Sequence, residues 1–229
     1  ELAMGFAING YIAEEKKLLR KGGGKVGDKI VLTKPLGTGA LFAADMRAKC
    51  KGKHVAEALE MMSKSNGPAS RVAISMRKDV HACTDITGFG LFGHLLEMLM
   101  ANDNRSLGAE IDIDRVEFLQ GALEASSNDV FSSLQHENQR SRRAVTNHEQ
   151  VVRSFPVKYP LLFDPQTAGG LLFFVDSKAI QKFVDQLNDS NVQIIGELVH
   201  RKDLEGQHPE NKGYDEFEQK YIRVISGSE

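Results

Sequence analysis

The residues best suited to chemistry are an acid and the glycine-rich turn that follows it. Asp85 stands two positions before Thr87, and Gly88 and Gly90 come next, ahead of an apolar helical run that ends at Met100. Glycine lets a backbone approach a ligand closely, and the N–H groups at a helix start favour anions. A carboxylate beside an anion site generally needs a cation between the two, commonly Mg²⁺ with a phosphate. We therefore predict Asp85 as a metal ligand and Thr87, Gly88 and Gly90 as a phosphate-side turn.

The same glycines fit a second interpretation, the dinucleotide-binding fingerprint. Gly88, Gly90 and Gly93 have its spacing, and Glu110 and Asp112 lie about where the acid that holds a ribose is expected. That fingerprint also needs a buried, nearly continuous apolar strand in front of it. Residues 80–85 are too polar for such a strand, so the sequence favours the metal interpretation. NADH binding to the isolated chain, followed by fluorescence, distinguishes the two.

Two further stretches combine turn residues with a strand. Asp164 opens an Asp-Pro turn that leads through Gly169 and Gly170 into an apolar strand at 171–175, and we favour a turn or helix-capping role for it over a catalytic one. Near the start of the chain, Thr38 is predicted to cap a helix over 40–49 after a strand. That joint is equally consistent with an anion site and with an ordinary strand–helix connection.

Composition excludes several classes of protein. The chain has 229 residues, 41% hydrophobic and 26% charged, with a formal net charge of -2, which is an ordinary globular composition without the basic field that nucleic-acid binding needs. No apolar run reaches the roughly 20 residues that cross a membrane. The two cysteines, Cys50 and Cys83, are too few for a disulfide scaffold and are interpreted as small buried side chains. We expect a cytoplasmic protein with neither nucleic-acid nor membrane partners.

Strands and helices mix without strict alternation, which predicts an α+β fold of layered sheet and helices. Strands are expected at 4–12, 29–34, 107–113, 171–175, 192–199 and 220–225, and helices at 40–49, 53–64, 68–77, 116–124 and 178–189. Polar loops are expected at 203–214 and at 126–148, the latter a long surface excursion.

Three groups of polar residues could have a functional role, and for each we favour a structural one. Arg140, Arg142 and Arg143 in the 126–148 segment could hold phosphates, but a solvated helical face is favoured. The basic, glycine-rich stretch at 20–25 is interpreted as a connector rather than a phosphate cradle. His54 and His81 have polar neighbours and no second ligand four residues on, so both are expected at the surface or at helix caps and not as metal ligands.

Three stretches together resemble selenophosphate synthetase (selenide, water dikinase), a member of the aminoimidazole ribonucleotide synthetase-like superfamily. They are residues 27–39 with Lys-Pro-Leu-Gly-Thr-Gly, 84–94 with Thr-Asp-Ile-Thr-Gly-Phe-Gly, and 163–172 with Asp-Pro-Gln-Thr-Ala-Gly-Gly. Their order and separation match as well, and residues 195–199 resemble a late strand of the family. Small departures are Ala168, where the family more often has Ser, and Phe92, where it more often has Leu.

The resemblance implies a domain organisation and an activity. Residues 25–229 would be the C-terminal synthetase domain, similar to the aminoimidazole ribonucleotide synthetase C-terminal domain, and residues 1–24 the end of an N-terminal ATP-binding domain and a linker. The intact enzyme would convert ATP, selenide and water to selenophosphate, AMP and orthophosphate with Mg²⁺. Asp85 would be the one metal carboxylate from this half. The Cys or selenocysteine and the Lys would lie in the other half, so no catalytic residue is expected here and the isolated chain should be inactive.

The resemblance also bears on partners. The intact enzyme is expected to be a homodimer, formed chiefly through the other half. The 126–148 segment resembles the version found where the synthetase is fused to a flavin-dependent reductase-like domain. Two other functions stay open: a related ATP-dependent synthetase of purine or thiamine biosynthesis, and a non-catalytic supporting or interaction domain in which replacing Asp85 is silent.

Overall fold

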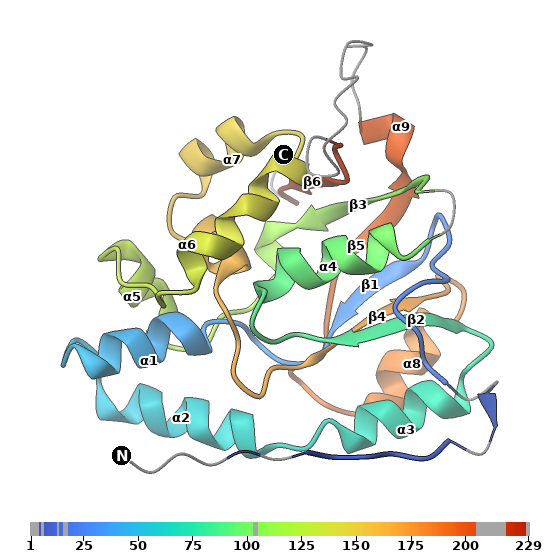
Figure 1. The fold of residues 1–229 in the computed structure, drawn as a ribbon, viewed down its shortest axis with the longest axis horizontal. Coiled ribbons are helices and arrows are strands. Elements are labelled where there is room, and N and C mark those ends of the chain that lie inside the picture. The colour runs from blue at the N-terminus through green and yellow to red at the C-terminus, as the bar shows by residue number, and fades with distance from the viewer. Residues whose placement is uncertain are drawn as a thin grey trace.

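A computed structural model describes residues 5, 7–12, 14–15, 18–102, 105–204 and 219–227 (Figure 1). The strands are β1 (Lys29–Leu32), β2 (Val80–Asp85), β3 (Leu107–Asp112), β4 (Leu171–Val175), β5 (Gln193–His200) and β6 (Ile222–Ile225). The helices are α1 (Thr38–Met46), α2 (Gly52–Ser63), α3 (Gly67–Ser75), α4 (Gly90–Met100), α5 (Ala122–Ser127), α6 (Gln135–Asn138), α7 (His148–Ser154), α8 (Ile180–Leu187) and α9 (Arg201–Leu204). Short 3₁₀ turns span Ile113–Arg115, Gln139–Ala144 and Tyr159–Phe163.

The strands form one mixed sheet in the order β2-β4-β1-β5-β3-β6. Every neighbouring pair is antiparallel except β3 with β6, which is parallel. Neighbours in the sheet are mostly far apart in sequence, so helices lie between successive strands without forming regular crossovers. The predicted α+β fold is confirmed.

Alternation along the strands divides the core between the two faces of the sheet. In β1, Ile30 and Leu32 face one side, where α4 packs, while Val31 faces the other side, where α3 and α8 pack. Figure 1 shows α4 lying across the sheet on one face and α3 and α8 grouped beside its β2–β4 side. This period of two is what a strand buried on both faces by different helices requires. A separate apolar cluster joins α1, α2 and α5 beside the sheet.

The polar stretch 80–85 forms a strand, but not the buried parallel strand that the sequence argument excluded. β2 is an edge strand paired antiparallel with β4 only, with a bulge between Val80 and Ala82. An edge position does not demand the continuous apolar run of a buried parallel strand. The polar residues at 81, 84 and 85 are therefore tolerated, and the strand that a dinucleotide fold needs is still not present here.

Other expectations are corrected where local pattern gave way to packing. The helix predicted over 116–124 begins only at Ala122, after Gly121 with a φ of 84°. The 126–148 segment is no surface excursion, because Gln135, Ser141 and Val145 are buried. Residues 5 and 7–12 form no strand. The predicted loop at 203–214 lies mostly outside the described residues.

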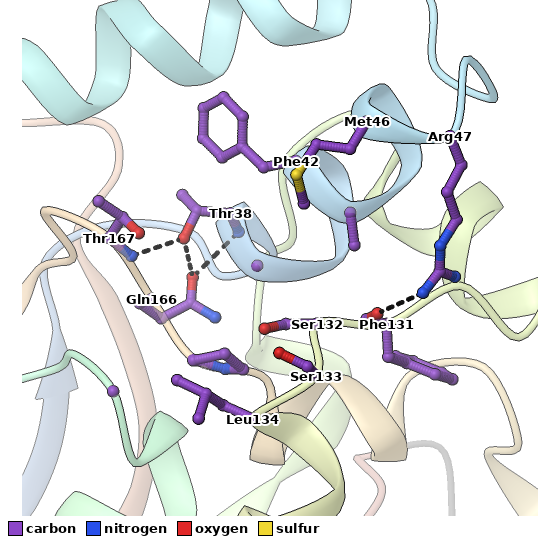
Figure 2. A pocket seen from close by; sticks show the side chains of 14 residues that line it. Thr38, Phe42, Met46, Arg47, Phe131, Ser132, Ser133, Leu134, Gln166 and Thr167 are labelled. Carbon is purple, nitrogen blue, oxygen red and sulfur yellow. Dashed lines mark hydrogen bonds between the residues drawn. The ribbon is translucent and has the colours of Figure 1, made fainter. Parts of the chain in front are cut away.

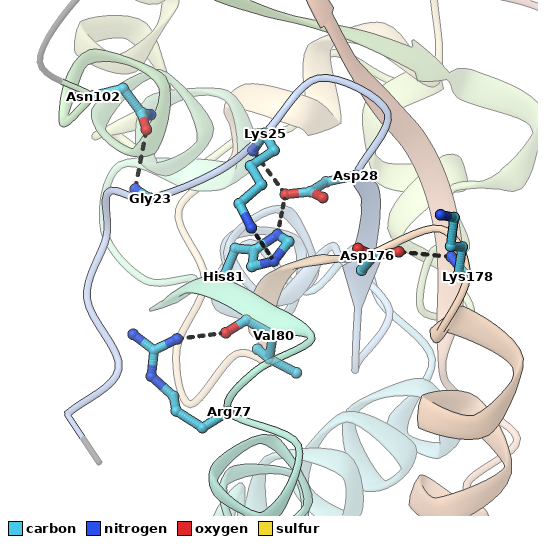
Figure 3. A network of polar contacts seen from close by, with 9 residues as sticks. All are labelled: Gly23, Lys25, Asp28, Arg77, Val80, His81, Asn102, Asp176 and Lys178. Carbon is cyan, nitrogen blue, oxygen red and sulfur yellow. Dashed lines mark hydrogen bonds and ion pairs between the residues drawn. The ribbon is translucent and has the colours of Figure 1, made fainter. Parts of the chain in front are cut away.

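His54 and His81 are buried rather than at the surface, each with 7% of its side chain exposed. His81 Nδ1 lies 2.8 Å from Asp28 Oδ2, and its Nε2 lies 3.0 Å from Lys25 Nζ (Figure 3). These contacts fix the segment 18–27, which we call the N-terminal strap, against the edge strand β2. The backbone joins in, since the amide of Cys83 donates to the carbonyl of Arg20.

Within the described part of the chain, no helix combines the length and the apolar character needed to cross a membrane.

Candidate functional site

The acid and the glycine turn lie where β2 ends and α4 begins. Asp85 is the last residue of β2, and its side chain is exposed. Gly90 begins α4 with a φ of 69°, and a Cβ there would lie 2.7 Å from the carbonyl carbon of Phe163. Glycine is required at this position both for backbone conformation and for close approach. Gly88 is exposed and has open space around it.

Both polar groups of the Thr87 backbone are already bonded within the protein. Its N–H donates to His94 Nε2 at 3.0 Å, and its carbonyl accepts the amide of Gln166 at 2.9 Å and that of Gly90 at 3.1 Å. The backbone N–H groups of Thr87 and Gly90 therefore serve the turn itself. The Thr87 hydroxyl also lies 3.2 Å from His94 Nε2, so among the predicted phosphate-side residues Gly88 is the exposed one.

Gln166 connects this turn to the beginning of α1. Its Oε1 accepts from the amides of Gly37 (2.9 Å) and Thr38 (3.2 Å) and lies 3.2 Å from Thr38 Oγ1. The Thr38 hydroxyl in turn accepts from the amide of Thr167 at 2.9 Å (Figure 2). The side chain of Gln166 is buried, although it lies at the wall of a pocket. The three stretches that carry the family resemblance thus converge on one glutamine.

Asp164 caps helix α1 from a distant part of the chain. Its Oδ2 accepts from the amide of Ala40 at 2.8 Å, whereas Thr38, the predicted cap, is the first helical residue and Gly37 holds the cap position with a φ of 121°. The Asp164 carboxyl therefore occupies the position at the start of α1 where an anion would bind. Of the two interpretations of this segment, an ordinary strand–helix connection is favoured over an anion site. The capping role favoured for Asp164 is confirmed.

Burial dominates the electrostatics of Asp164. The side chain has no exposed surface, and its Oδ1 has no hydrogen-bond partner among the described residues. Burial raises the pKa of Asp164 to about 7, although hydrogen bonds from Ala40, Gln166, Gly39 and Ser132 favour the charged form. Burial therefore favours the protonated carboxyl over the carboxylate.

A pocket of about 370 Å³ opens beside these bonds (Figure 2). Its wall combines hydroxyl groups with apolar side chains. The lining residues are Thr38, Gly39, Phe42, Ala43, Met46, Arg47, Gly88, Phe131, Ser132, Ser133, Leu134, Pro165, Gln166 and Thr167. Gly88 is thus the predicted site residue that reaches the pocket, whereas Asp85, Thr87 and Gly90 are not among its lining residues.

Asn138 is a site residue that sequence reasoning missed. Its Nδ2 donates to the carbonyl of Gly88 at 2.8 Å and to that of Phe163 at 3.0 Å. It lies at the end of α6, inside the segment interpreted as a surface excursion. The only sequence signal for this segment was its resemblance to a longer version of the loop in the family, and that resemblance does not predict which residues Asn138 contacts. Arg140, in the same segment, is exposed and pairs with Glu137, as a solvated face predicts.

The cysteines and the arrangement of possible metal ligands limit which reactions the described residues could catalyse. Burial, together with the charge of Asp85, raises the pKa of the Cys83 thiol to about 12, and burial also raises that of Cys50. Neither is a thiolate nucleophile at neutral pH. The described residues contain no group of three or more His, Cys, Asp or Glu side chains arranged to hold a metal ion. Asp85 alone therefore could contribute one ligand to a metal and no more.

Comparisons with known proteins place the fold in a family. Residues 25–209 match the model for AIR synthase related protein, C-terminal domain. The selenide, water dikinase of Campylobacter jejuni (strain RM1221) is 33% identical over 205 residues, covering 89% of this chain and 56% of that protein. The enzyme of the same name from Clostridioides difficile (strain 630) is 35% identical over 201 residues, covering 85% and 55%. The chain spans about half the length of the curated relatives it matches.

Solved structures show the same fold at low sequence identity. The hydrogenase maturation protein HypE superposes with a TM-score of 0.56 at 13% identity over 81% of this chain and 48% of that one. HypE in complex with ATP gives 0.55 at 13% identity, over 81% and 46%. The family match, the dikinase relatives and the mixed sheet agree, and the chain belongs to the family of AIR synthase related proteins, as the C-terminal domain, among relatives that are selenide, water dikinases.

Proposed function

We propose that this chain is the C-terminal domain of a selenophosphate synthetase, which converts ATP, selenide and water to selenophosphate, AMP and orthophosphate. Support comes from the dikinase names of its relatives and from the convergence of the 27–39, 84–94 and 163–172 stretches around Gln166. The relatives are about twice as long, so the complete activity belongs to the full-length protein. The sequence of the 84–94 stretch favours a selenophosphate synthetase over a synthetase of purine or thiamine biosynthesis.

The observation that carries the proposal is the placement of Asp85. Its carboxylate is exposed at the end of β2, and no described residue forms a hydrogen bond or ion pair with it. Mg²⁺ prefers such hard oxygen ligands and usually takes one or two protein carboxylates together with phosphate oxygens and water. The donor fits Mg²⁺, and the remaining ligands would come from the nucleotide, from water and from residues beyond this domain. A bound Mg²⁺ would supply neutralisation of phosphate charge.

The other residues of the turn prepare the position of Asp85. Gly90 allows α4 to start directly against Phe163, and the bonds of the Thr87 backbone keep the turn in one conformation. Gly88 remains exposed at the rim of the pocket, where a phosphate oxygen could approach its backbone. The pocket's hydroxyl groups and apolar wall suit the less charged part of a nucleotide. The chain thus offers a preformed surface to a metal–nucleotide complex.

The test is Asp85→Asn in the full-length protein. Because asparagine keeps the size of the side chain but removes its charge, we expect AMP formation to fall at least ~100-fold, about 2.7 kcal/mol in activation free energy, with the fold unchanged. AMP is measured by chromatography and folding by circular dichroism. Asp185→Asn, an exposed carboxylate on α8, is the matched control and should leave the rate unchanged. Turnover near the unmutated level in Asp85→Asn contradicts the ligand assignment and favours a supporting, non-catalytic domain.

A further inference from the structure

A chain of polar contacts joins the acid turn to the N-terminal strap through His94. His94 lies in the second turn of α4 and is buried, with 5% exposed. Its Nε2 accepts the amide hydrogen of Thr87 at 3.0 Å, and its Nδ1 lies 3.2 Å from Glu97 Oε2. Glu97 also pairs with Lys21 of the strap at 2.9 Å. The strap is held independently, at Gly23 by Asn102 and at Lys25 by His81 (Figure 3).

The contacts define which nitrogen of His94 carries its hydrogen. A backbone N–H can only donate, so Nε2 must be the acceptor and the hydrogen lies on Nδ1, which donates to Glu97. Burial lowers the pKa of His94, against the opposing effect of the Glu97 and Asp85 charges, while the charge of Lys21 lowers it further. The neutral ring is therefore the form that the surroundings favour.

This ring fixes the backbone that carries Asp85. The residue between Asp85 and Thr87, Ile86, is buried, and its amide donates to the carbonyl of Gly170 at 2.9 Å. Next, the Thr87 amide is held by His94 and its carbonyl by Gln166. The Asp85 carboxylate has no partner among the described residues. The direction in which it leaves the sheet is therefore set by the backbone on either side of it, the pairing of Asp85 with Leu171 in the β2–β4 ladder and the held turn that follows, and not by side-chain contacts of its own.

We propose that His94 is a positioning residue that holds Asp85 in the orientation for metal binding. The inference rests on the proposed function, in which Asp85 is a metal ligand. Groups that orient a metal ligand through hydrogen bonds typically change metal affinity 10- to 100-fold when they are removed. His94 acts one step further out, through the Thr87 peptide, so the lower end of that range applies.

Three substitutions separate the hydrogen bond from the packing of the ring. His94→Phe keeps an aromatic ring against Phe89, whose ring centroid lies 5.4 Å away, but removes the acceptor for the Thr87 amide. His94→Gln places its amide oxygen about where Nε2 lies and restores an acceptor. His94→Asn reaches only as far as Nδ1 and leaves the Thr87 amide unpaired. The matched control is His148→Phe, because His148 also contacts an aromatic ring, that of Tyr159, but lies on α7.

The experiment measures Mn²⁺ binding to the full-length enzyme in the presence of a non-hydrolysable ATP analogue, by electron paramagnetic resonance of free Mn²⁺. His94→Phe and His94→Asn should weaken Mn²⁺ binding ~10-fold, whereas His94→Gln should stay within about 3-fold of the unmutated enzyme. His148→Phe should leave the affinity unchanged even where it lowers thermal stability. If His94→Phe does not fold, His94→Asn against His94→Gln gives the same comparison.

Asp85→Asn is titrated alongside and separates the two possible failures. If Asp85→Asn weakens Mn²⁺ binding but the His94 variants all bind normally, the positioning role is wrong and the ligand role of Asp85 stands. A His94→Gln affinity as low as that of His94→Phe also overturns the positioning role, because the acceptor was then not what mattered. If Asp85→Asn itself binds Mn²⁺ normally, the proposed metal role falls and the role of His94 falls with it.

Discussion

Asp164 shows how one buried carboxyl can make stability depend on pH. In the folded chain, burial keeps its proton to about pH 7, whereas in the unfolded chain the proton leaves near the ordinary value of 3.8. The folded state therefore binds more protons between those values, and the free energy of unfolding falls as the pH rises from 3.8 to about 7. The size of the effect is on the order of 4 kcal/mol at most.

Replacing Asp164 by Asn should remove this dependence. Asparagine cannot ionise, yet its oxygen can still accept the amide of Ala40, so the unfolding free energy of the variant should fall less between pH 4 and pH 7 than that of the unmutated chain. Urea unfolding at a series of pH values measures the difference. Asp176→Asn is the control, because Asp176 also accepts a backbone amide, that of Lys178, but is more exposed. Parallel pH profiles for Asp164→Asn and the unmutated chain would show that Asp164 is ionised in the fold.

At the scale of elements, the start of α1 is completed by side chains from the 164–170 loop. Helix ends need partners for their free amide groups, and here Gln166 and Asp164 supply them across more than 120 residues of sequence. The same loop is tied to the end of β1, since Lys34 Nζ donates to the carbonyl of Ala168 at 3.1 Å. The loop therefore acts as a common support for α1 and for the turn that begins α4.

Removal of the Gln166 side chain should destabilise the start of α1 and lower the free energy of unfolding. In Gln166→Ala the buried amides of Gly37 and Thr38 lose their acceptor, and at about 1–3 kcal/mol for each unsatisfied group we expect a loss of about 2–6 kcal/mol in unfolding free energy. Urea unfolding gives the value. Gln181→Ala, which removes an exposed contact with Asp185 on α8, should change stability by less than about 0.5 kcal/mol. Equal effects of the two substitutions would mean that Gln166 is not the support we describe.

At the scale of the whole molecule, Asp85 is the exposed carboxylate proposed as a ligand, the described residues form no metal-binding group of three or more such side chains, and the relatives are about twice the length of this chain. We expect the isolated 229-residue chain to fold but to form no AMP from ATP and selenide, and the full-length protein to do so. Chromatography of the nucleotides under anaerobic conditions, with Mg²⁺ supplied in excess of ATP, compares the two. AMP formation by the isolated chain at a rate within ~10-fold of the full-length protein would show that the chemistry is complete in this domain.

Two features of the intact protein stay predictions. They are a homodimer formed chiefly outside this chain, and a fused flavin-dependent reductase-like domain suggested by the 126–148 segment. The structure changes how that segment is understood, because its buried residues and the Asn138 contacts make it part of the site's support. Its length is therefore explained within the domain, and a fusion is not needed to account for it.

Much of the fold could be predicted from the sequence, because local pattern determines it. Turn residues followed by an apolar strand pattern gave the strands at 29–32 and 171–175, alternation gave 107–112, and apolar stripes gave α2, α3 and α8. Local pattern gave less where tertiary position mattered. It excluded a buried parallel strand at 80–85 but did not predict the antiparallel edge strand found there, and the 116–121 stretch is not a helix despite its apolar spacing. The glycine at 90 was identified from sequence, and its partner Phe163 was not.

The sequence by itself determined the α+β class, the acid and the glycines of the turn, and the resemblance that the family match then bore out. Only the tertiary structure decided that Gln166 bonds to the start of α1, 128 residues away, and that His94, Glu97 and Lys21 connect the turn to the strap. The physical reason is that periodicity and turn chemistry act over a few residues. The partner of a buried polar group is chosen by how whole elements pack, and sequence spacing carries no record of it.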